Sequence, residues 1–160
     1  MKRDELLAAL EAARARLDAA LEGLTEAELT RPGTVGDWSI KDLMAHVTAW
    51  DVDLLTNLGQ AKRGQKPGRT AWDNAAIQAQ NVAWYAEFKD RPLDRVVADY
   101  DGVHAQLLRR VEGLTDSELE APAAWLQGRP LFQYFLDDVV THEGEHGAEL
   151  AKWRATQKSG

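Results

Sequence analysis

The chain contains no cysteine, which excludes disulfide bonds, cysteine-based zinc sites and cysteine nucleophiles. It also lacks long apolar runs, because no stretch approaches the roughly 18 apolar residues that a membrane-spanning helix requires. Its first five residues, MKRDE, lead into mixed charged, Ala and Leu residues instead of the apolar core of a signal peptide. We therefore expect a cytoplasmic protein that has no membrane partner.

Basic residues are in the minority, since 19 Lys and Arg stand against 26 Asp and Glu and give a formal net charge of −7. A protein that binds nucleic acid needs a basic face for the phosphate groups. The charge balance therefore predicts that the chain has no nucleic-acid partner. The length of 160 residues and the 44% hydrophobic content suit one domain with one sizeable core.

Hydrophobic residues recur at steps of three and four in several long segments, which is the spacing of amphipathic helices. Ser39-Ile-Lys-Asp42 has the layout of a capping box, and Thr70 and Pro92 mark two further helix starts. Residues 1–154 are thus predicted to form one all-α domain, an antiparallel four-helix bundle with one extra short helix, and residues 155–160 a polar tail. The expected helices cover residues 2–22, 39–58, 70–89, 92–112 and 130–153.

Two connectors share a phrase. Residues 22–29 (EGLTEAEL) and 112–119 (EGLTDSEL) both read Glu-Gly-Leu-Thr and end in Glu-Leu. One interpretation is a two-fold repeat of helical hairpins. The other is that this phrase is a common way to end one helix and start the next.

Histidines occupy inward positions on two of the expected helices. The last helix has a stripe at steps of three and four that includes two of them: Phe135, Val139, His142, His146, Leu150 and Trp153. On the second helix, His46 lies between Leu43 and Trp50 at the same steps. His104 lies one position off the stripe of its helix and is predicted at the boundary of the core.

A histidine in the core is costly unless both ring nitrogens find partners. Two histidines at i and i+4 can instead converge on one cation, and a third from another helix leaves further coordination positions open. Neutral imidazoles suit Zn(II), Ni(II) or Fe(II) better than Mg or Ca. We therefore predict a metal site formed by His46, His142 and His146. The alternative is that all three are hydrogen-bonded core residues.

Three carboxylates lie about one turn from these histidines on the same helices: Asp42, Asp138 and Glu149. Such acids fix a histidine tautomer, bind the metal as a fourth ligand or act as a general base. They are the candidate catalytic residues. The alternative for each is a solvated acid on a helix face.

The segment His142-Glu143-Gly144-Glu145-His146 also has the His-Glu-x-x-His pattern of zinc peptidases. Only 14 residues follow His146, and they contain neither a third histidine ligand nor a strand-like segment. Glu143 is rotated about 100° from His142 around an α-helix, so the pattern does not assign it as a base. We therefore expect no peptidase site.

Two motifs resemble those of the DinB/YfiT-like superfamily: residues 37–46 (DWSIKDLMAH) with Trp50 after them, and residues 141–146 (THEGEH). The resemblance implies an antiparallel four-helix bundle in which the three histidines hold a divalent metal, usually Zn or Ni, and a frequent homodimer. Its characterised members include thiol-dependent S-transferases and isomerases that use low-molecular-weight thiols such as bacillithiol or mycothiol. The related colibactin self-resistance group has a similar second helix but not the His-x-x-x-His ending.

We therefore expect a metal-dependent enzyme that acts on a small molecule, an S-transferase or a hydrolase in which the metal activates a thiol or water. Because the chain has no cysteine, the thiol would come from a cosubstrate. The alternative is a non-catalytic bundle, a stress-related or binding protein, in which the histidines or the metal are structural.

Two further groups of residues have two interpretations each. One basic cluster either meets an anionic cosubstrate or forms a solvated loop: Lys62, Arg63, Lys66 and Arg69. Three tryptophans either wall a pocket at the mouth of the bundle or pack in the core: Trp38, Trp50 and Trp125.

Overall fold

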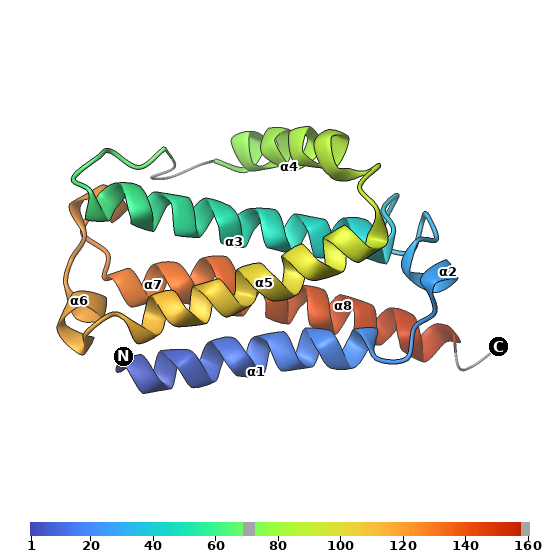
Figure 1. Cartoon of the computed structure of the whole chain (residues 1–160), viewed down its shortest axis with the longest axis horizontal. Coiled ribbons are helices and arrows are strands. Elements are labelled where there is room, and N and C mark those ends of the chain that lie inside the picture. Colours follow the sequence, from blue (N-terminus) through green and yellow to red (C-terminus); the bar gives the residue numbers. More distant parts are fainter. Residues whose placement is uncertain (69–72, 158–160) are drawn as a thin grey trace.

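The computed structural model describes residues 1–68 and 73–157, and helices dominate them (Figure 1). The described residues contain no strand, only two isolated β-bridges. The all-α prediction is therefore confirmed. Four long helices form the bundle: α1 (Arg3–Leu21), α3 (Ile40–Lys62), α5 (Leu93–Glu112), and a last helix composed of α7 (Leu131–Phe135), the π-helical segment η2 (Leu136–Thr141) and α8 (His142–Gln157).

Along the bundle axis, α1 and the last helix run in one direction, and α3 and α5 run in the opposite direction (Figure 1). α1 packs beside α8 in the same direction, and α3 packs beside α5 in the same direction. α3 and α5 run in parallel because the extra helix, α4 (Asn74–Phe88), returns the chain along the outside of α3 before α5 begins. The helices that follow each other around a connector, α1 with α3 and α5 with the last helix, are antiparallel.

Local capping signals place most helix starts. Ser39 caps α3, since its hydroxyl accepts from the Asp42 N–H (3.1 Å) while its own N–H donates to the Asp42 carboxylate (2.9 Å). The predicted capping box is therefore confirmed. Asp73 caps α4, whereas the predicted cap Thr70 lies outside the described residues. α8 continues to Gln157, so the first residues of the expected polar tail are helical.

The two similar connectors make the same turn. α2 (Glu26–Leu29) and α6 (Asp116–Glu120) each begin after a threonine that exchanges hydrogen bonds with a glutamate three residues later. The threonine N–H donates to that glutamate over 2.8 Å at Thr25 and 2.7 Å at Thr115. The shared phrase therefore encodes a shared local structure. A further short helix, η1 (Ala124–Leu126), lies only in the second connector.

The last helix departs from the predicted continuous helix. In the π-helical segment η2, which directly precedes His142, each turn holds more residues than an α-turn, so the residues after it are rotated relative to a continuous α-helix. As a result Glu143, Gly147 and Leu150 are the buried positions of α8. His142 and His146 lie beside these buried positions, on the side of α8 that faces α3.

Two apolar clusters fill the bundle, one toward each end. One contains Leu10, Leu54 and Leu107, and the other contains Leu17, Val47 and Tyr100. Between them each bundle helix contributes one buried polar residue: Arg14, Asp51, His104 and Glu143. The core is therefore two apolar layers with a polar layer between them. No helix within the described residues is both long enough and apolar enough to cross a bilayer.

Gly147 lets α8 approach α1 closely. A Cβ at this position would lie 3.3 Å from the Leu17 nitrogen and 3.4 Å from its Cα, both of them backbone atoms. We expect Gly147→Ala to lower the free energy of unfolding by about 1–3 kcal/mol, because the two helices have to separate. Urea denaturation measures the change.

Gly144 is the matched control in the same helix, since a Cβ there meets nothing within 4 Å. Gly144→Ala should raise the free energy of unfolding, by up to about 1 kcal/mol, through helix propensity alone. Equal effects of the two substitutions would contradict the close contact between α1 and α8.

Candidate metal centre

Three histidine side chains from α3 and α8 converge on one point. The Nε2 atom of His142 lies 2.9 Å from Nε2 of His46 and 3.0 Å from Nε2 of His146. The ring centroids of His46 and His146 are 5.3 Å apart. The structure therefore brings together the three histidines that the sequence pattern selected, and they form a group able to bind a metal ion.

The geometry of these nitrogens fits a cation. Imidazole nitrogens that bind one Zn²⁺ at 2.0–2.1 Å lie about 3–3.4 Å from each other. Hydrogen bonding alone satisfies the arrangement poorly, because the His142 Nε2 contacts two other nitrogens and can direct one proton at one of them. Within the described residues, the buried Nδ1 of His46 also has no hydrogen-bond partner.

Burial keeps His46 and His146 in the neutral form that binds metal. Desolvation lowers the pKa of His46 to about 3, and the charge of His146 acts in the same direction. Desolvation also lowers the pKa of His146, although the nearby Glu149 carboxylate opposes the shift. His46 and His146 are therefore available as ligands without the loss of a proton at neutral pH.

The histidines lie at the wall of a cavity of about 380 Å³. Trp50 lines the cavity from α3, and its ring lies 6.4 Å from that of His46. The ring of Trp38 lies 5.2 Å from that of His46 but outside the cavity lining. Helix α4 holds these rings: the Trp50 indole N–H donates to Asn81 (3.0 Å), and Trp38 stacks on Tyr85. Acidic residues from the last helix line the other side: Asp137, Asp138 and Glu145.

The three candidate carboxylates lie in different places. Asp138 lines the cavity. The Glu149 carboxylate lies outside it, 3.4 Å from the Nδ1 atom of His146. The Asp42 carboxylate accepts from the N–H and the hydroxyl of Ser39 (2.9 and 2.7 Å), so it caps the helix that carries His46.

Trp125 and the described residues of the basic cluster lie far from this cavity. Trp125 packs against Tyr134, with ring centroids 5.2 Å apart, near the opposite end of the bundle. Lys62 is about 24 Å from His46 along α3, at 1.5 Å per residue. Arg69 lies outside the described residues. Within the described residues the basic cluster therefore does not line the histidine cavity.

A buried ionic cluster lies in the polar layer, and sequence reasoning missed it. The Arg14 guanidinium contacts Glu143 through Nε (3.1 Å) and Asp51 through Nη2 (3.2 Å). It also donates to the Tyr100 carbonyl (3.2 Å). His104 is 9% exposed, with Nδ1 4.0 Å from Glu143, so its prediction as a boundary residue is wrong.

The electrostatics of this ionic cluster favour one bound proton. Two carboxylates face one guanidinium, so a single proton makes the group neutral. Burial and the Glu143 charge raise the pKa of Asp51 well above its usual value, and burial raises the pKa of Glu143. Arg14 opposes both shifts. Burial, with a further contribution from Arg14, lowers the pKa of His104 to about 4, which leaves the proton on the carboxylates at neutral pH.

A four-helix bundle in which α3 and α8 bring three histidines together defines the class of this protein. The chain belongs to the DinB superfamily, whose sequence profile matches residues 9–150. The family resemblance predicted from the two histidine motifs is thereby confirmed. No curated protein sequence matches the chain.

Solved structures share this fold over nearly the whole chain. An uncharacterised protein from Escherichia coli UTI89 superposes with a TM-score of 0.86 at 15% identity, over 98% of this chain and 95% of that one. The colibactin self-resistance protein ClbS, solved in complex with dsDNA, gives 0.83 at 16% identity, over 96% and 95%. The sibling lethal factor precursor DfsB gives 0.83 at 17% identity, over 98% and 97%.

The ClbS complex contradicts the prediction that nucleic acid is excluded as a partner. A protein of this fold was solved with dsDNA, so the fold is compatible with nucleic acid. The prediction relied on the net charge of −7, which is a sum over the whole chain. A sum does not report where cations gather on the surface, and local potential is what a phosphate group meets.

Removal of the central cation should destabilise the fold strongly. Arg14→Met leaves Asp51 and Glu143 buried without a cation, so we expect the free energy of unfolding to fall by about 3–5 kcal/mol. Arg16→Met is the matched control, because Arg16 is exposed on the same helix and should change stability by less than about 0.5 kcal/mol. Urea denaturation of both variants measures this.

Neutralising the acids should restore part of the loss. Adding Asp51→Asn and Glu143→Gln to Arg14→Met removes the unpaired charges, so this triple variant should be more stable than Arg14→Met alone. If Arg14→Met costs no more than Arg16→Met, the ionic cluster does not stabilise the fold.

The depressed pKa of His46 predicts a pH dependence for the metal-free protein. Below pH 6.5 the unfolded chain binds a proton at this imidazole and the folded chain does not, so acidification favours unfolding. The stability advantage of wild type over His46→Gln should shrink by about 1 kcal/mol per pH unit as the pH falls from 6.5 to 5. Urea denaturation in the presence of a chelator measures both proteins, and a constant difference would contradict the shift.

Proposed function

We propose that this chain is a metal-dependent enzyme that holds one divalent cation, Zn²⁺ or Ni²⁺, on His46, His142 and His146. The observation that carries the proposal is the convergence of three imidazole nitrogens at the wall of an open cavity. Catalytic metal sites combine three protein ligands with an open position, whereas structural sites are closed by four. The nitrogen donors favour Zn²⁺ or Ni²⁺ over Mg²⁺ or Ca²⁺.

The substrate is a small molecule, and the reaction is thiol transfer or hydrolysis. A bound divalent cation would supply Lewis acidity, which lowers the pKa of water or of a thiol. The Trp50 ring, which lines the cavity, would contact the apolar part of the substrate and keep bulk water away from the reacting atoms. Because the chain has no cysteine, a thiol nucleophile would be a cosubstrate.

The three carboxylates would have separate roles. Asp138 lines the cavity one helical turn from His142 and would accept the proton of the nucleophile. Glu149 would hold the Nδ1 proton of His146 and so fix Nε2 as the ligand atom. Asp42 would act as a positioning residue, because it caps the helix on which His46 lies.

Metal content tests the proposed ligands. Wild-type protein should contain near-stoichiometric Zn or Ni, and His142→Ala should lose it. His104→Gln is the matched control, because His104 belongs to a second group that could hold a metal, with Asp51 and Glu143. Mass spectrometry of the metals should find that His104→Gln retains its metal. If His104→Gln loses metal while His142→Ala keeps it, the cation lies in the polar layer instead.

A second measurement separates the enzyme from a bundle with a structural metal. The protein loaded with Co²⁺ should develop a sulfur-to-metal charge-transfer band when 2-mercaptoethanol is added, because an open position accepts the thiol. Removal of the metal with a chelator should leave the helical circular dichroism unchanged. A closed site that unfolds on chelation would support the structural alternative and contradict the proposed function.

A further inference from the structure

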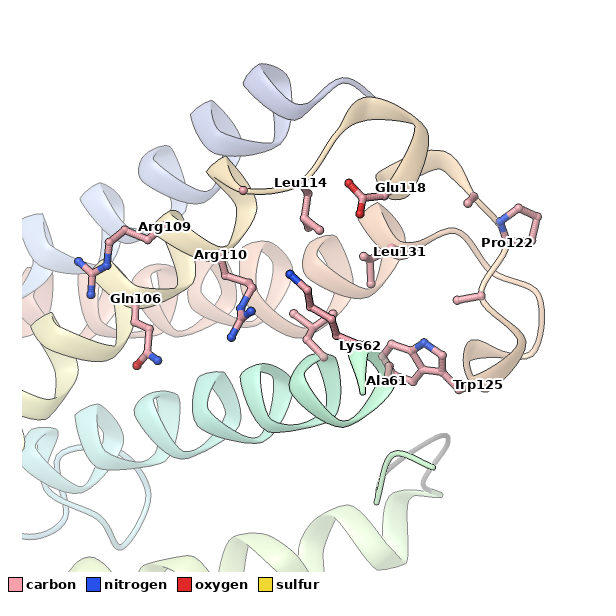
Figure 2. A pocket seen from close by; sticks show the side chains of 14 residues that line it. Ala61, Lys62, Gln106, Arg109, Arg110, Leu114, Glu118, Pro122, Trp125 and Leu131 are labelled. Carbon is pink, nitrogen blue, oxygen red and sulfur yellow. The ribbon is translucent and has the colours of Figure 1, made fainter. Parts of the chain in front are cut away.

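A second cavity lies at the end of the bundle opposite to the histidines. Its volume is about 450 Å³, and it lies between the last turns of α3 and α5, the second connector and the start of α7 (Figure 2). Lys62, on its wall, is about 24 Å from His46 along α3. The volume is in the range of small-molecule sites. The cavity is therefore large enough for a ligand and separate from the metal centre.

The floor of this cavity is apolar. Leu58 and Ala61 come from α3, Leu114 and Trp125 from the connector, and Leu131 from α7. Trp125 is only partly buried, and Tyr134 holds it in place, with ring centroids 5.2 Å apart. A half-exposed indole beside leucines offers a surface for an apolar or aromatic group.

Three cations line the same cavity: Lys62, Arg109 and Arg110. Figure 2 shows the side chains of Lys62 and Arg110 extending from α3 and α5 into the space between these helices. Within the described residues, no carboxylate forms an ion pair with any of the three. The acid that lines the cavity, Glu118, accepts from the N–H and hydroxyl of Thr115 (2.7 and 2.8 Å). These hydrogen bonds lower the pKa of Glu118, and the charge of Lys62 contributes in the same direction from beyond ion-pair distance.

Three cations at an apolar cavity, with no ion pair to any carboxylate in the part of the chain that the structure describes, are unexpected in an acidic chain. Acidic residues outnumber basic ones by 26 to 19, so a carboxylate partner for each cation would be easy to supply. Cations in the last turn of a helix do interact with the helix dipole, and this applies to Lys62, Arg109 and Arg110. The dipole does not require an apolar floor beside them, however, whereas an amphipathic anion requires both features.

We propose that this cavity binds a small organic anion, a carboxylate attached to an extended apolar body. The carboxylate would lie between Lys62 and Arg110, because a guanidinium binds a carboxylate with two parallel hydrogen bonds. The apolar body would lie on Leu58, Leu131 and Trp125. An inorganic anion leaves this floor uncovered, and an uncharged apolar ligand leaves the cations unpaired.

Decanoate is the probe for this proposal, and the six Trp indole N–H signals in ¹H–¹⁵N spectra are the readout. Trp125→Phe assigns the Trp125 signal. Decanoate should shift this signal and leave those of Trp38 and Trp50 unchanged, because the latter two lie at the other end of the bundle. Acetate, which lacks the apolar body, and decan-1-ol, which lacks the charge, should each bind at least about tenfold more weakly.

Charge variants test the cations. Arg110→Gln and Lys62→Gln should each weaken decanoate binding about tenfold, the loss expected for one charge-assisted hydrogen bond. Arg95→Gln is the matched control, because Arg95 is exposed near the opposite end of α5 and should leave the affinity unchanged. Circular dichroism confirms that each variant folds, and Lys62 is exposed, so its substitution does not disturb the core.

Two results would overturn the proposal. One is decanoate binding that is equal in wild type, Arg110→Gln and Lys62→Gln. The other is a spectrum in which the Trp125 signal does not move up to millimolar decanoate. Because the histidines are not involved, metal-free and metal-loaded protein should bind decanoate equally. Failure of this proposal therefore does not affect the proposed function, and failure of the proposed function does not affect this proposal.

Discussion

The Arg14 guanidinium is the contact on which the alignment of the bundle depends. It lies between Asp51 and Glu143, and with His104 these residues place one polar group from each bundle helix at the same level. Removing a charge from water costs free energy, and only oppositely charged groups at the same level of the bundle offset that cost. If one helix slipped by a turn, a carboxylate or the guanidinium would remain buried and unpaired. Apolar layers alone would tolerate such a slip far better.

This alignment also positions the candidate metal centre. Glu143 is adjacent to His142 in the chain, and Asp51 follows His46 by a little more than one turn of the same helix. An ionic cluster that holds α3 and α8 against α1 therefore holds the histidines as well. The π-helical segment η2 completes the arrangement, because it turns α8 so that Glu143 faces the bundle axis while His142 faces α3. The fold itself thus positions the three histidines.

Local patterns were sufficient for much of this structure. Apolar spacing predicted the bundle helices, the Ser39 capping box predicted the start of α3, and the i, i+4 pair predicted the geometry of two histidines. The polar layer was missed because its members come from four distant segments. One signal was present: Arg14, Asp51 and His104 each stand four residues after one buried apolar residue and three before the next. The π-turn has no such signal, because tertiary packing imposes it, and net charge could not report where cations gather.

The two connectors separate what local sequence determines from what position determines. The same Glu-Gly-Leu-Thr phrase makes the same threonine-capped turn at both ends of the bundle. After the first turn the chain reaches Trp38, which lies against His46. After the second it reaches Trp125, which lies beside Lys62 and the α5 arginines. Local sequence therefore fixes the turn, whereas the helices that meet there decide the chemistry: imidazole nitrogens at one end and cations beside an apolar floor at the other. The two proposed sites, one for a cation and one for an anion, would then share one bundle without competing for the same ligand.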